Sequence, residues 1–502
     1  MMIVKSGKTQ WQNRHEVFTQ PIKDLYFLGN DNSMNALDAY NDATVAIQKL
    51  IADAIQQNTT LRALGSGWSW TKIATTGNNG IMLDTKPLNS IFTISQQQVS
   101  PDYKGDVSKL VFAQCGAAIW ELSQYLQIRN LSLKTSGASN GQTIAGAIGS
   151  GAHGSAFDFG AVQDFVVGLH IVVGPNRHIF LERKSAPVAG SEIIQKLKAE
   201  LVQDDALFYA ALISMGCFGF VHGVMIETES LYLLECYMRR MPYDANLKKI
   251  METLDFSNAN LPCGTERPFH FAVQINPYDI DKGVYVTSMY KRPYTHDYQR
   301  ASDNQDGIGP GDDAACFVGR LTQAVPAAVP FIVNKLLAGA LTPYEKKMGT
   351  LGEIFDNTTL HGKLLCAAIG IPISFVNKVV DILLPMTRGN VPYAGLFALR
   401  YVKKSNATLA FTRFDTTCIL ELDAVFSDAT LQFYSAVWDK LEQANIPFTF
   451  HWGKMTELDP DRLKSKYGAA ADSWLAARNQ LLDADTRNVF TNPVMQQWGL
   501  DK

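Results

Sequence analysis

The 502-residue sequence has few features of a secreted disulfide scaffold, a zinc protein or a membrane protein. Its seven cysteines include no CxxC pair, which argues against a zinc ribbon and against a dense disulfide framework. The N-terminal residues lack the long apolar segment of a secretory signal. No run reaches the ~18 uninterrupted apolar residues that a membrane-spanning helix needs. We therefore expect a cytoplasmic protein with no membrane span.

An excess of charge of one sign is also missing. Lys and Arg total 45 against 48 Asp and Glu, a net charge of −3, and there is no basic stripe of the kind that nucleic-acid binders carry. The nine histidines show no HxH or HxxxH spacing, so we expect no metal site. A GxSxG motif is absent, which argues against a serine hydrolase. The expected partner is a small molecule rather than a nucleic acid.

Length and composition indicate a globular protein with more than one domain. The chain is too long for a single core, and its hydrophobic fraction of 46% is ordinary for folded proteins. Up to about residue 230, short strand and helix patterns alternate, which predicts an α+β nucleotide-binding region. The expected helices cover 37–57 and 119–128, and the expected strands cover 61–63, 81–83, 109–113 and 165–173.

Beyond Tyr232 the expected strands become longer and predict a second domain with a large sheet. They cover 269–275, 283–290, 395–402 and 417–425. The polar stretch 302–313 is expected to be a loop. The apolar stretches 324–340 and 364–384 are broken by Pro, Asn or Lys and are expected to be helices, within a helical insert at 315–385. The tail is expected to be helical from about Asp472 and to end in a small extended piece at 489–493.

Three glycine-rich segments are the strongest candidates for a ligand site. Gly65-Ser66-Gly67 follows a strand; positive φ at glycine lets successive N–H groups converge on an anion such as pyrophosphate, although an ordinary turn has the same composition. Residues 136–155 hold six glycines in twenty positions, interleaved with hydroxyl residues, which suits backbone laid against a planar ligand. Residues 214–226 place two glycines before a β-branched strand, which suits close approach to an adenine. None of these segments is a Rossmann GxGxxG or a P-loop.

These segments, in this order, resemble the FAD-binding domain of the vanillyl-alcohol oxidase family of PCMH-type flavoproteins, with the closest likeness to the aldonolactone oxidase and alditol oxidase branch. The residues that carry the resemblance are Arg62, Gly65, Trp68-Ser69-Trp70, Gln142-Thr143, Gly146, Gly151-Ala152-His153-Gly154-Ser155, Gly216, Gly219, His451-Trp452-Gly453-Lys454, Asp485 and Phe490-Thr491-Asn492. The likeness covers about 35–230 and 445–495 and is weak across 236–390.

The resemblance implies an α+β fold of two domains. A PCMH-type FAD-binding domain of two α/β subdomains is expected at 1–235, a substrate-binding cap domain built on a large antiparallel sheet with helices at 236–470, and a tail at 471–502 that returns to the FAD domain. The implied reaction is oxidation of a CH–OH group on a small-molecule substrate, with a hydride passing to flavin N5 and oxygen or another acceptor reoxidising the flavin. The expected FAD-binding residues are Leu64, Gly65, Ser66, Gly67, Trp68, Ser69, Gly137, Ser139, Gly141, Thr143, Gly146, Ala147, Ser150, Gly151, His153, Gly154, Ser155, Gly216, Gly219, Val221, Ile226, Lys454 and Asn492.

Two positions depart from the family pattern. Trp68 stands where many relatives carry the histidine that bonds covalently to the flavin, so we expect non-covalent FAD. Sugar-oxidising relatives carry a Glu-x-Arg on a strand facing the flavin, and here the match is Ala398-Leu399-Arg400. The arginine is kept and the acid is missing. Glu421 on the next expected strand is a replacement or a surface carboxylate.

Three residues are expected to be catalytic. Lys454 would stabilise an anionic reduced flavin, and either a neutral His451 or a Lys454 of depressed pKa would accept the hydroxyl proton. Arg400 would hold a substrate oxygen by charge-assisted hydrogen bonds, unless it is a surface arginine. Two other readings stay open: a flavin-dependent oxidase that tailors or cyclises a natural product, and a flavin-fold binding module that has lost its chemistry. The sequence does not choose between an oxidase and a dehydrogenase.

Overall fold

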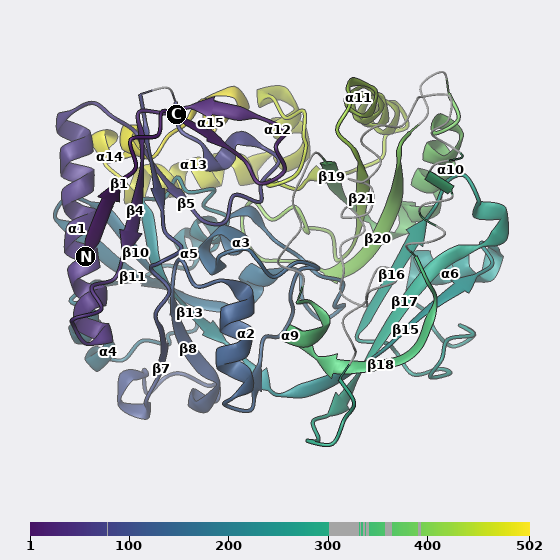
Figure 1. Cartoon of the computed structure of the whole chain (residues 1–502), viewed down its shortest axis with the longest axis horizontal. Helices are drawn as coiled ribbons and strands as arrows, with labels where there is room; N and C mark the ends of the chain where they lie inside the picture. The colour runs from purple at the N-terminus through teal and green to yellow at the C-terminus, as the bar shows by residue number, and fades with distance from the viewer. Residues whose placement is uncertain are drawn as a thin grey trace.

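The computed structural model describes the chain apart from residues 78, 301–330, 332, 335–336, 338–340, 357–363, 390–392 and 502. The described part is an α+β fold with three main sheets (Figure 1). The loop expected at 302–313 and most of the helix expected at 324–340 lie outside the described residues.

The first sheet is built from the N-terminal segment and has four strands in the order β1-β4-β6-β5. Their bounds are β1 Met2–Lys5, β4 Asp24–Gly29, β5 Leu61–Leu64 and β6 Ile81–Asp84. The pairs β4–β6 and β5–β6 are parallel, and helix α1 (Ala36–Gln56) connects β4 to β5. The side chain of Asn35 caps α1 by accepting from the backbone of Asp38, and the helix buries one apolar face that includes Tyr40, Ile47 and Ile51.

The second sheet has six strands in the order β12-β11-β10-β13-β8-β7. Their bounds are β7 Ile91–Thr93, β8 Leu110–Gln114, β10 Val166–Gly174, β11 Arg177–Glu182, β12 Glu200–Gln203 and β13 Phe220–Glu227. The helices between these strands are α2 Ile119–Gln127, α3 Ile144–Ser150, α4 Ser191–Leu197 and α5 Asp205–Leu212. Two short strand pairs, β2 (Gln10–Gln12) with β3 (Thr19–Pro21) and β9 (Leu131–Ser132) with β14 (Glu229–Ser230), complete this half of the chain. The strands and helices expected here are confirmed to within two residues at each end.

The third sheet has eight strands, and all neighbouring pairs are antiparallel. The order is β18-β15-β17-β16-β20-β21-β19-β22. Their bounds are β15 Tyr232–Met241, β16 His270–Ile275, β17 Val284–Pro293, β18 Tyr344–Thr350, β19 Leu364–Pro372, β20 Gly395–Lys403, β21 Thr416–Val425 and β22 Thr449–Phe450. The helices of this region are α6 Ala245–Thr253, α9 Leu351–Ile354, α10 Val376–Met386 and α11 Asp428–Gln443. Figure 1 shows this teal and green sheet beside the purple and blue half of the molecule.

The C-terminal helices return to the N-terminal half of the molecule (Figure 1). They are α12 Pro460–Tyr467, α13 Ala469–Leu481, α14 Ala484–Val489 and α15 Pro493–Trp498. The indole of Trp474 donates to the carbonyl of Ile213, and the guanidinium of Arg478 donates to the carbonyl of Cys217. The tail therefore docks beside the third glycine-rich segment.

The helical insert expected at 315–385 is wrong for part of its length. Residues 344–350 form strand β18, and residues 364–372 form strand β19, while helix α10 begins only at Val376. Strand β19 lies between β21 and β22, and eight of its nine residues are buried. A strand that is buried on both faces has the same unbroken apolar run as a buried helix, so periodicity does not separate the two.

The small extended piece expected at 489–493 is shorter than predicted. Helix α14 ends at Val489 and helix α15 begins at Pro493, which leaves three residues between them. Proline favours the first turn of a helix, and the side chain of Asn492 caps α15 by accepting from the backbone of Met495. The signal at this position therefore marked the start of a helix. Within the described part of the chain, no helix combines the length and apolar character needed to cross a bilayer.

Candidate active site

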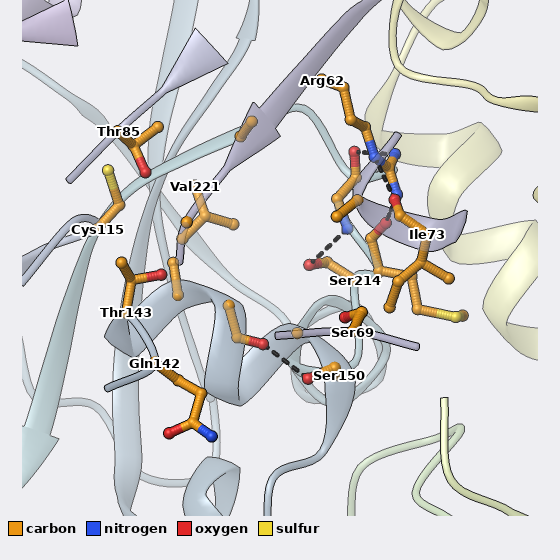
Figure 2. Close-up of a pocket in the computed structure, with 18 of the residues that line it drawn as sticks. Arg62, Ser69, Ile73, Thr85, Cys115, Gln142, Thr143, Ser150, Ser214 and Val221 are labelled. Carbon is orange, nitrogen blue, oxygen red and sulfur yellow. Dashed lines mark hydrogen bonds between the residues drawn. The ribbon is translucent and has the colours of Figure 1, made fainter. Parts of the chain in front are cut away.

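The three glycine-rich segments converge on one cavity. Figure 2 shows Arg62 and Ile73 on one side of this cavity and Thr85, Cys115 and Thr143 on the opposite side. The cavity therefore combines the end of β5, the segment that leads into α3, and the loop before β13.

Arg62 ties the first glycine-rich segment to the third. Its side chain is buried, Nε donates to the carbonyl of Ile73 at 2.6 Å, and Nη1 donates to the carbonyl of Gly216 at 3.0 Å. Gly216 has a φ of +70°, in the left-handed region that favours glycine. Arg62 therefore fixes the cavity wall through hydrogen bonds to backbone carbonyls of both segments.

The second segment is folded so tightly that a side chain would not fit at its end. A Cβ on Gly154 would overlap the carbonyl oxygen of Ser136, so the two ends of the segment lie backbone against backbone. A Cβ on Gly65 would likewise overlap the hydroxyl of Thr143, which brings the first segment against the second. These close approaches hold the first and second segments together at the cavity.

Two polar side-chain atoms at this wall have no hydrogen-bond partner among the described residues. They are Nε1 of Trp68 and Oγ of Ser139, and both atoms are buried. Trp68 lines the first cavity and a second, adjacent one, and Ser139 lines the second. Because buried polar groups are normally hydrogen-bonded, these atoms fit a site that receives a polar ligand.

The second cavity joins the glycine-rich wall to the eight-stranded sheet. The two cavities share Trp68, Ser69, Gln142 and Ser150. The loop 451–454 is docked at this junction: the backbone N–H of Trp70 donates to the carbonyl of Gly453 at 2.8 Å, and the hydroxyl of Thr71 donates to the carbonyl of Trp452 at 2.7 Å. The loop expected to be catalytic therefore lies against the first motif.

A buried cluster of charged side chains covers the sheet side of the second cavity. Nε of Arg400 lies 2.7 Å from Oε2 of Glu421, and Nζ of Lys454 lies 3.0 Å from Oε1 of the same carboxylate. Burial acts to raise the pKa of Glu421, but Arg400, Lys454 and His153 outweigh it, and the pKa is lowered far below its ordinary value. Glu421 is thus an anion held between two cations.

The position of Glu421 accounts for the acid that the sequence lacks beside Arg400. In the ladder between β20 and β21, Glu421 lies directly opposite Ala398. Ala398 and Arg400 point to the same face of the sheet because they are two residues apart. The carboxylate therefore reaches Arg400 from the neighbouring strand, and it is 3% exposed, which excludes the surface alternative. The surface reading of Arg400, which is also buried, is wrong for the same reason.

Two histidines complete the lining and are neutral at pH 7. Burial lowers the pKa of His153 to about 4 and lowers the pKa of His451 well below its ordinary value. The backbone N–H of Gly453 donates to Nδ1 of His451 at 2.9 Å, so the proton of that neutral ring lies on Nε2. Nδ1 of His153 lies 3.2 Å from the carbonyl oxygen of Gly154 and donates to it, which leaves a lone pair on Nε2.

Most residues expected to bind the cofactor or to be catalytic line the two cavities. Those that do are Gly65, Ser66, Gly67, Trp68, Ser69, Gly137, Ser139, Thr143, Gly146, Ser150, His153, Gly216, Gly219, Val221, Arg400, His451 and Lys454. The structure places the other expected residues behind the lining: Leu64, Gly141, Ala147, Gly151, Gly154, Ser155, Ile226 and Asn492.

Two of the residues behind the lining have well-defined hydrogen bonds. The amide of Asn492 donates to the carbonyls of Ile73 at 3.1 Å and Thr75 at 3.0 Å. The hydroxyl of Ser155 donates to the carbonyl of Phe271 and accepts from the backbone of Tyr401 at 2.9 Å. Both side chains hold the walls of the site together.

Sequence reasoning missed several lining residues. Arg62, Ile73, Ala74, Thr85, Cys115, Ala145, Gly149, Ser214 and Met215 line the first cavity, Trp70, Ala138, Ala152 and Gly453 line the second, and Gln142 lines both. Those that lie within the three glycine-rich segments belong to the motifs, so the bounds of the motifs could have indicated them. Thr85 and Cys115 sit outside any motif and reach the cavity only because β6 and β8 end beside it.

A family model described as an FAD binding domain matches residues 41–179, which include the first two glycine-rich segments. This match fits a PCMH-type FAD flavoprotein. The two joined cavities, the close backbone approaches and the buried polar atoms at Trp68 and Ser139 fit FAD, which supplies a hydride acceptor when it is bound.

This flavoprotein is similar to several curated sugar-lactone enzymes. It is 28% identical over 451 residues to L-gulono-1,4-lactone dehydrogenase of Mycobacterium tuberculosis, an alignment that covers 88% of this chain and 91% of that protein. It is 28% identical over 141 residues to D-arabinono-1,4-lactone oxidase of Kluyveromyces lactis, covering 28% of this chain and 25% of that protein. It is 24% identical over 210 residues to L-gulonolactone oxidase of Mus musculus, covering 42% and 40%. These findings fit an FAD-dependent oxidoreductase that acts on CH–OH groups.

A solved structure shares the fold of this flavoprotein over nearly its whole length. Cholesterol oxidase from B. sterolicum aligns with a TM-score of 0.71 at 14% identity, and the alignment covers 99% of this chain and 97% of that chain. At this identity the likeness shows the fold alone. The α+β fold with a large antiparallel sheet, expected from the sequence, is confirmed.

Proposed function

We propose that the flavoprotein oxidises an alcohol group of an aldonolactone or a closely related sugar derivative. The observation that carries this proposal is the Arg400–Glu421–Lys454 cluster at the second cavity, with ion-pair distances of 2.7 and 3.0 Å. A polyhydroxylated substrate offers donors to the carboxylate and acceptors to the two cations, whereas an apolar alcohol would leave the buried charges unsolvated. The lactone relatives support the same substrate class.

We assign the two halves of the fold to two tasks. Residues 1–235, together with the returning tail 471–502, form the FAD-binding domain, because the first cavity is lined entirely by residues before 235. Residues 236–470 form the substrate domain, which contributes Arg400, Glu421 and the loop 451–454 to the second cavity. On this division, we also assign to FAD binding the expected glycine-rich residues that lie behind the lining of the first cavity.

The hydrogen-bonding pattern of the site favours His153 as the group that accepts the hydroxyl proton. Lys454 bonds a carboxylate and acts as an ammonium donor, and the neutral ring of His451 carries its proton on Nε2. His153 has its lone pair on Nε2, 3.8 Å from Oε1 of Glu421. The carboxylate would stabilise the imidazolium that forms when His153 takes the proton. Arg400 and Lys454 then hold the substrate oxygens.

We further propose that FAD is held without a covalent bond. Trp68 lies at the junction of both cavities, and tryptophan lacks the imidazole nitrogen through which a histidine bonds to the flavin. Acid precipitation of purified protein should therefore leave the flavin absorbance in the supernatant. Flavin that stays with the pellet would contradict this part of the proposal.

The substrate proposal is tested by anaerobic reduction of the bound flavin. L-gulono-1,4-lactone should bleach the flavin absorbance, and a hydrophobic alcohol such as a sterol should not. Reoxidation by air with formation of hydrogen peroxide would indicate an oxidase, and reoxidation only by an added dye would indicate a dehydrogenase. Bleaching by neither sugar lactones nor polyols would overturn the proposal in favour of a natural-product oxidase or a binding module without redox chemistry.

A further inference from the structure

A buried thiol lies directly behind Lys454, in a position that the proposed reaction does not use. Cys366 is on strand β19, and Nζ of Lys454 donates to its Sγ at 2.9 Å. The same thiol donates to Oδ1 of Asp423 on strand β21 at 2.7 Å. Both Cys366 and Asp423 are fully buried. Lysine, thiol and carboxylate therefore form a continuous hydrogen-bonded chain that begins at the second cavity.

The sheet register explains how these groups come together. Cys366 lies opposite Asp423 in the β19–β21 ladder, and Ala368 lies opposite Glu421 one step further along. Residues two apart share a face, so Glu421 and Asp423 point to the same side of the sheet as Cys366. The small side chain of Ala368 leaves space beside Glu421. One face of two neighbouring strands thus carries both acids and the thiol toward Lys454.

We propose that Cys366 and Asp423 form a relay that orients the Lys454 ammonium and keeps it protonated. This inference rests on the proposed function, in which Lys454 binds a substrate oxygen. The ammonium has three N–H donors, and Glu421 and Cys366 take two of them at 3.0 and 2.9 Å. Cys366 and Asp423 act through Lys454, so they are positioning residues.

The chemistry of the thiol suits this role. A thiol accepts one hydrogen bond and donates another, so Cys366 links the Asp423 carboxyl group to Lys454 without a second buried ion pair. Among the described residues, the groups that face Lys454 include Glu421 on β21, Arg400 on β20, His153, His451 on its own loop and the ring of Trp70, whose centroid is 5.0 Å from Nζ. Glu421 contacts the ammonium directly, and Asp423 adds a second carboxyl group through the thiol.

The direct test is the infrared absorption of the S–H bond, which is read without flavin and without turnover. The band of Cys366 is assigned from the difference between the native protein and Cys366→Ser. Because Lys454 and Asp423 both polarise the S–H bond, Lys454→Met and Asp423→Asn should each move the band to higher wavenumber. The matched control is the band of Cys418, a buried thiol on β21 that contacts Tyr401 instead of the lysine; neither substitution should move it.

The kinetic test separates positioning from general destabilisation. Cys366→Ala should lower kcat/KM by roughly tenfold to a hundredfold, the loss expected from one hydrogen bond to a charged group. It should also shift the alkaline limb of the pH profile to lower pH, because an ammonium with fewer acceptors loses its proton more easily. Cys366→Ser should recover most of the rate, and Cys418→Ala should leave both rate and profile unchanged.

The outcomes distinguish this inference from the proposed function. If neither Lys454→Met nor Asp423→Asn moves the S–H band of Cys366, the proposed relay is wrong, even if the protein is a fully active lactone oxidase. An unshifted alkaline limb in a folded, active Cys366→Ala protein would overturn it as well. If the band shifts as expected but no lactone reduces the flavin, the relay stands and the substrate proposal fails.

Discussion

Glu421 and Ala398 face each other across the β20–β21 ladder, and the carboxylate occupies the space that a side chain on Ala398 would share. An acid at position 398 on β20 or at position 421 on β21 would lie on the same face of the sheet. Because Arg400 lies two residues from Ala398, an acid at either position reaches the same guanidinium. The pairing of charges, more than the position of one residue in the chain, defines this site.

This equivalence makes a substitution experiment possible. Glu421→Ala should lower kcat/KM for a sugar lactone by at least ~10²-fold, since it leaves Arg400 and Lys454 buried without their shared anion. The double variant Ala398→Glu/Glu421→Ala should recover a large part of that loss, which steady-state kinetics would measure. Ala398→Glu alone is the control and should be impaired, because it crowds a second acid against the first. A double variant no better than Glu421→Ala would mean that the acid acts only from β21.

The lone pair on His153 predicts the acid side of the pH profile. A base whose pKa is lowered to about 4 by burial stays neutral above that value, so kcat/KM should fall as the pH drops through about 4. His153→Asn should lower the rate by roughly 10²–10⁴-fold, the usual range for a lost general base, with flavin binding retained. His451→Asn is the comparison and should have the smaller effect. The reverse ranking would return the proton-accepting role to His451.

At the scale of elements, the site depends on backbone segments that touch. The loop 451–454 is tied to the residues after β5 by the Trp70–Gly453 and Thr71–Trp452 hydrogen bonds. Ser155 bonds backbone groups of β16 and β20, and so links the glycine-rich segment to the sheet that carries Arg400. The FAD-binding and substrate-binding halves are therefore positioned by contacts between loops and strand ends.

A single added methyl group should disturb this arrangement. Gly154→Ala places a Cβ against the carbonyl oxygen of Ser136, which is backbone and does not move aside cheaply. We expect a loss of ~1–3 kcal/mol in the free energy of unfolding, typical of overpacking, together with weaker FAD binding. Gly77→Ala is the control, because its Cβ would meet only Pro493 at 3.9 Å. Chemical denaturation and a flavin-fluorescence titration would measure both effects, and equal behaviour of the two variants would refute the packing argument.

At the scale of the whole molecule, buried histidines couple stability to pH. Burial lowers the pKa of His153 to about 4 and those of His222 and His270 to about 3, from an ordinary value of 6.5. Below pH 6.5 these histidines therefore bind protons in the unfolded chain but stay neutral in the folded chain. The free energy of unfolding should fall as the pH drops from 6.5 toward 4, by up to about 1.4 kcal/mol per pH unit for each histidine.

Denaturant unfolding at pH 7, 6 and 5 would measure this slope above the range in which ordinary carboxylates titrate. His222→Gln should flatten the slope, because it removes one of the buried histidines with a lowered pKa, while lowering stability at pH 7 through its lost bonds to Thr44 and Gln114. A replacement at the exposed His296 should leave the slope unchanged. A slope that does not respond to His222→Gln would show that other groups dominate acid unfolding.

The sequence by itself determined the α+β class, several of the strands before residue 230 and the glycine-rich segments that line the first cavity. These features are local: a turn that needs glycine, or a strand that alternates or stays apolar, leaves its pattern in consecutive residues. The same reasoning failed at β19, because a strand that is buried on both faces shows no alternation of apolar and polar residues.

Only the tertiary structure decided which distant residues complete the second cavity. Glu421 is an ordinary strand residue until the register sets it opposite Ala398 and beside Arg400. Cys366 and Asp423 show no motif at all, and they meet Lys454 only because β19, β21 and the loop 451–454 pack together. Strand pairing brings together residues that are far apart in the chain, so no pattern in a single sequence reveals it.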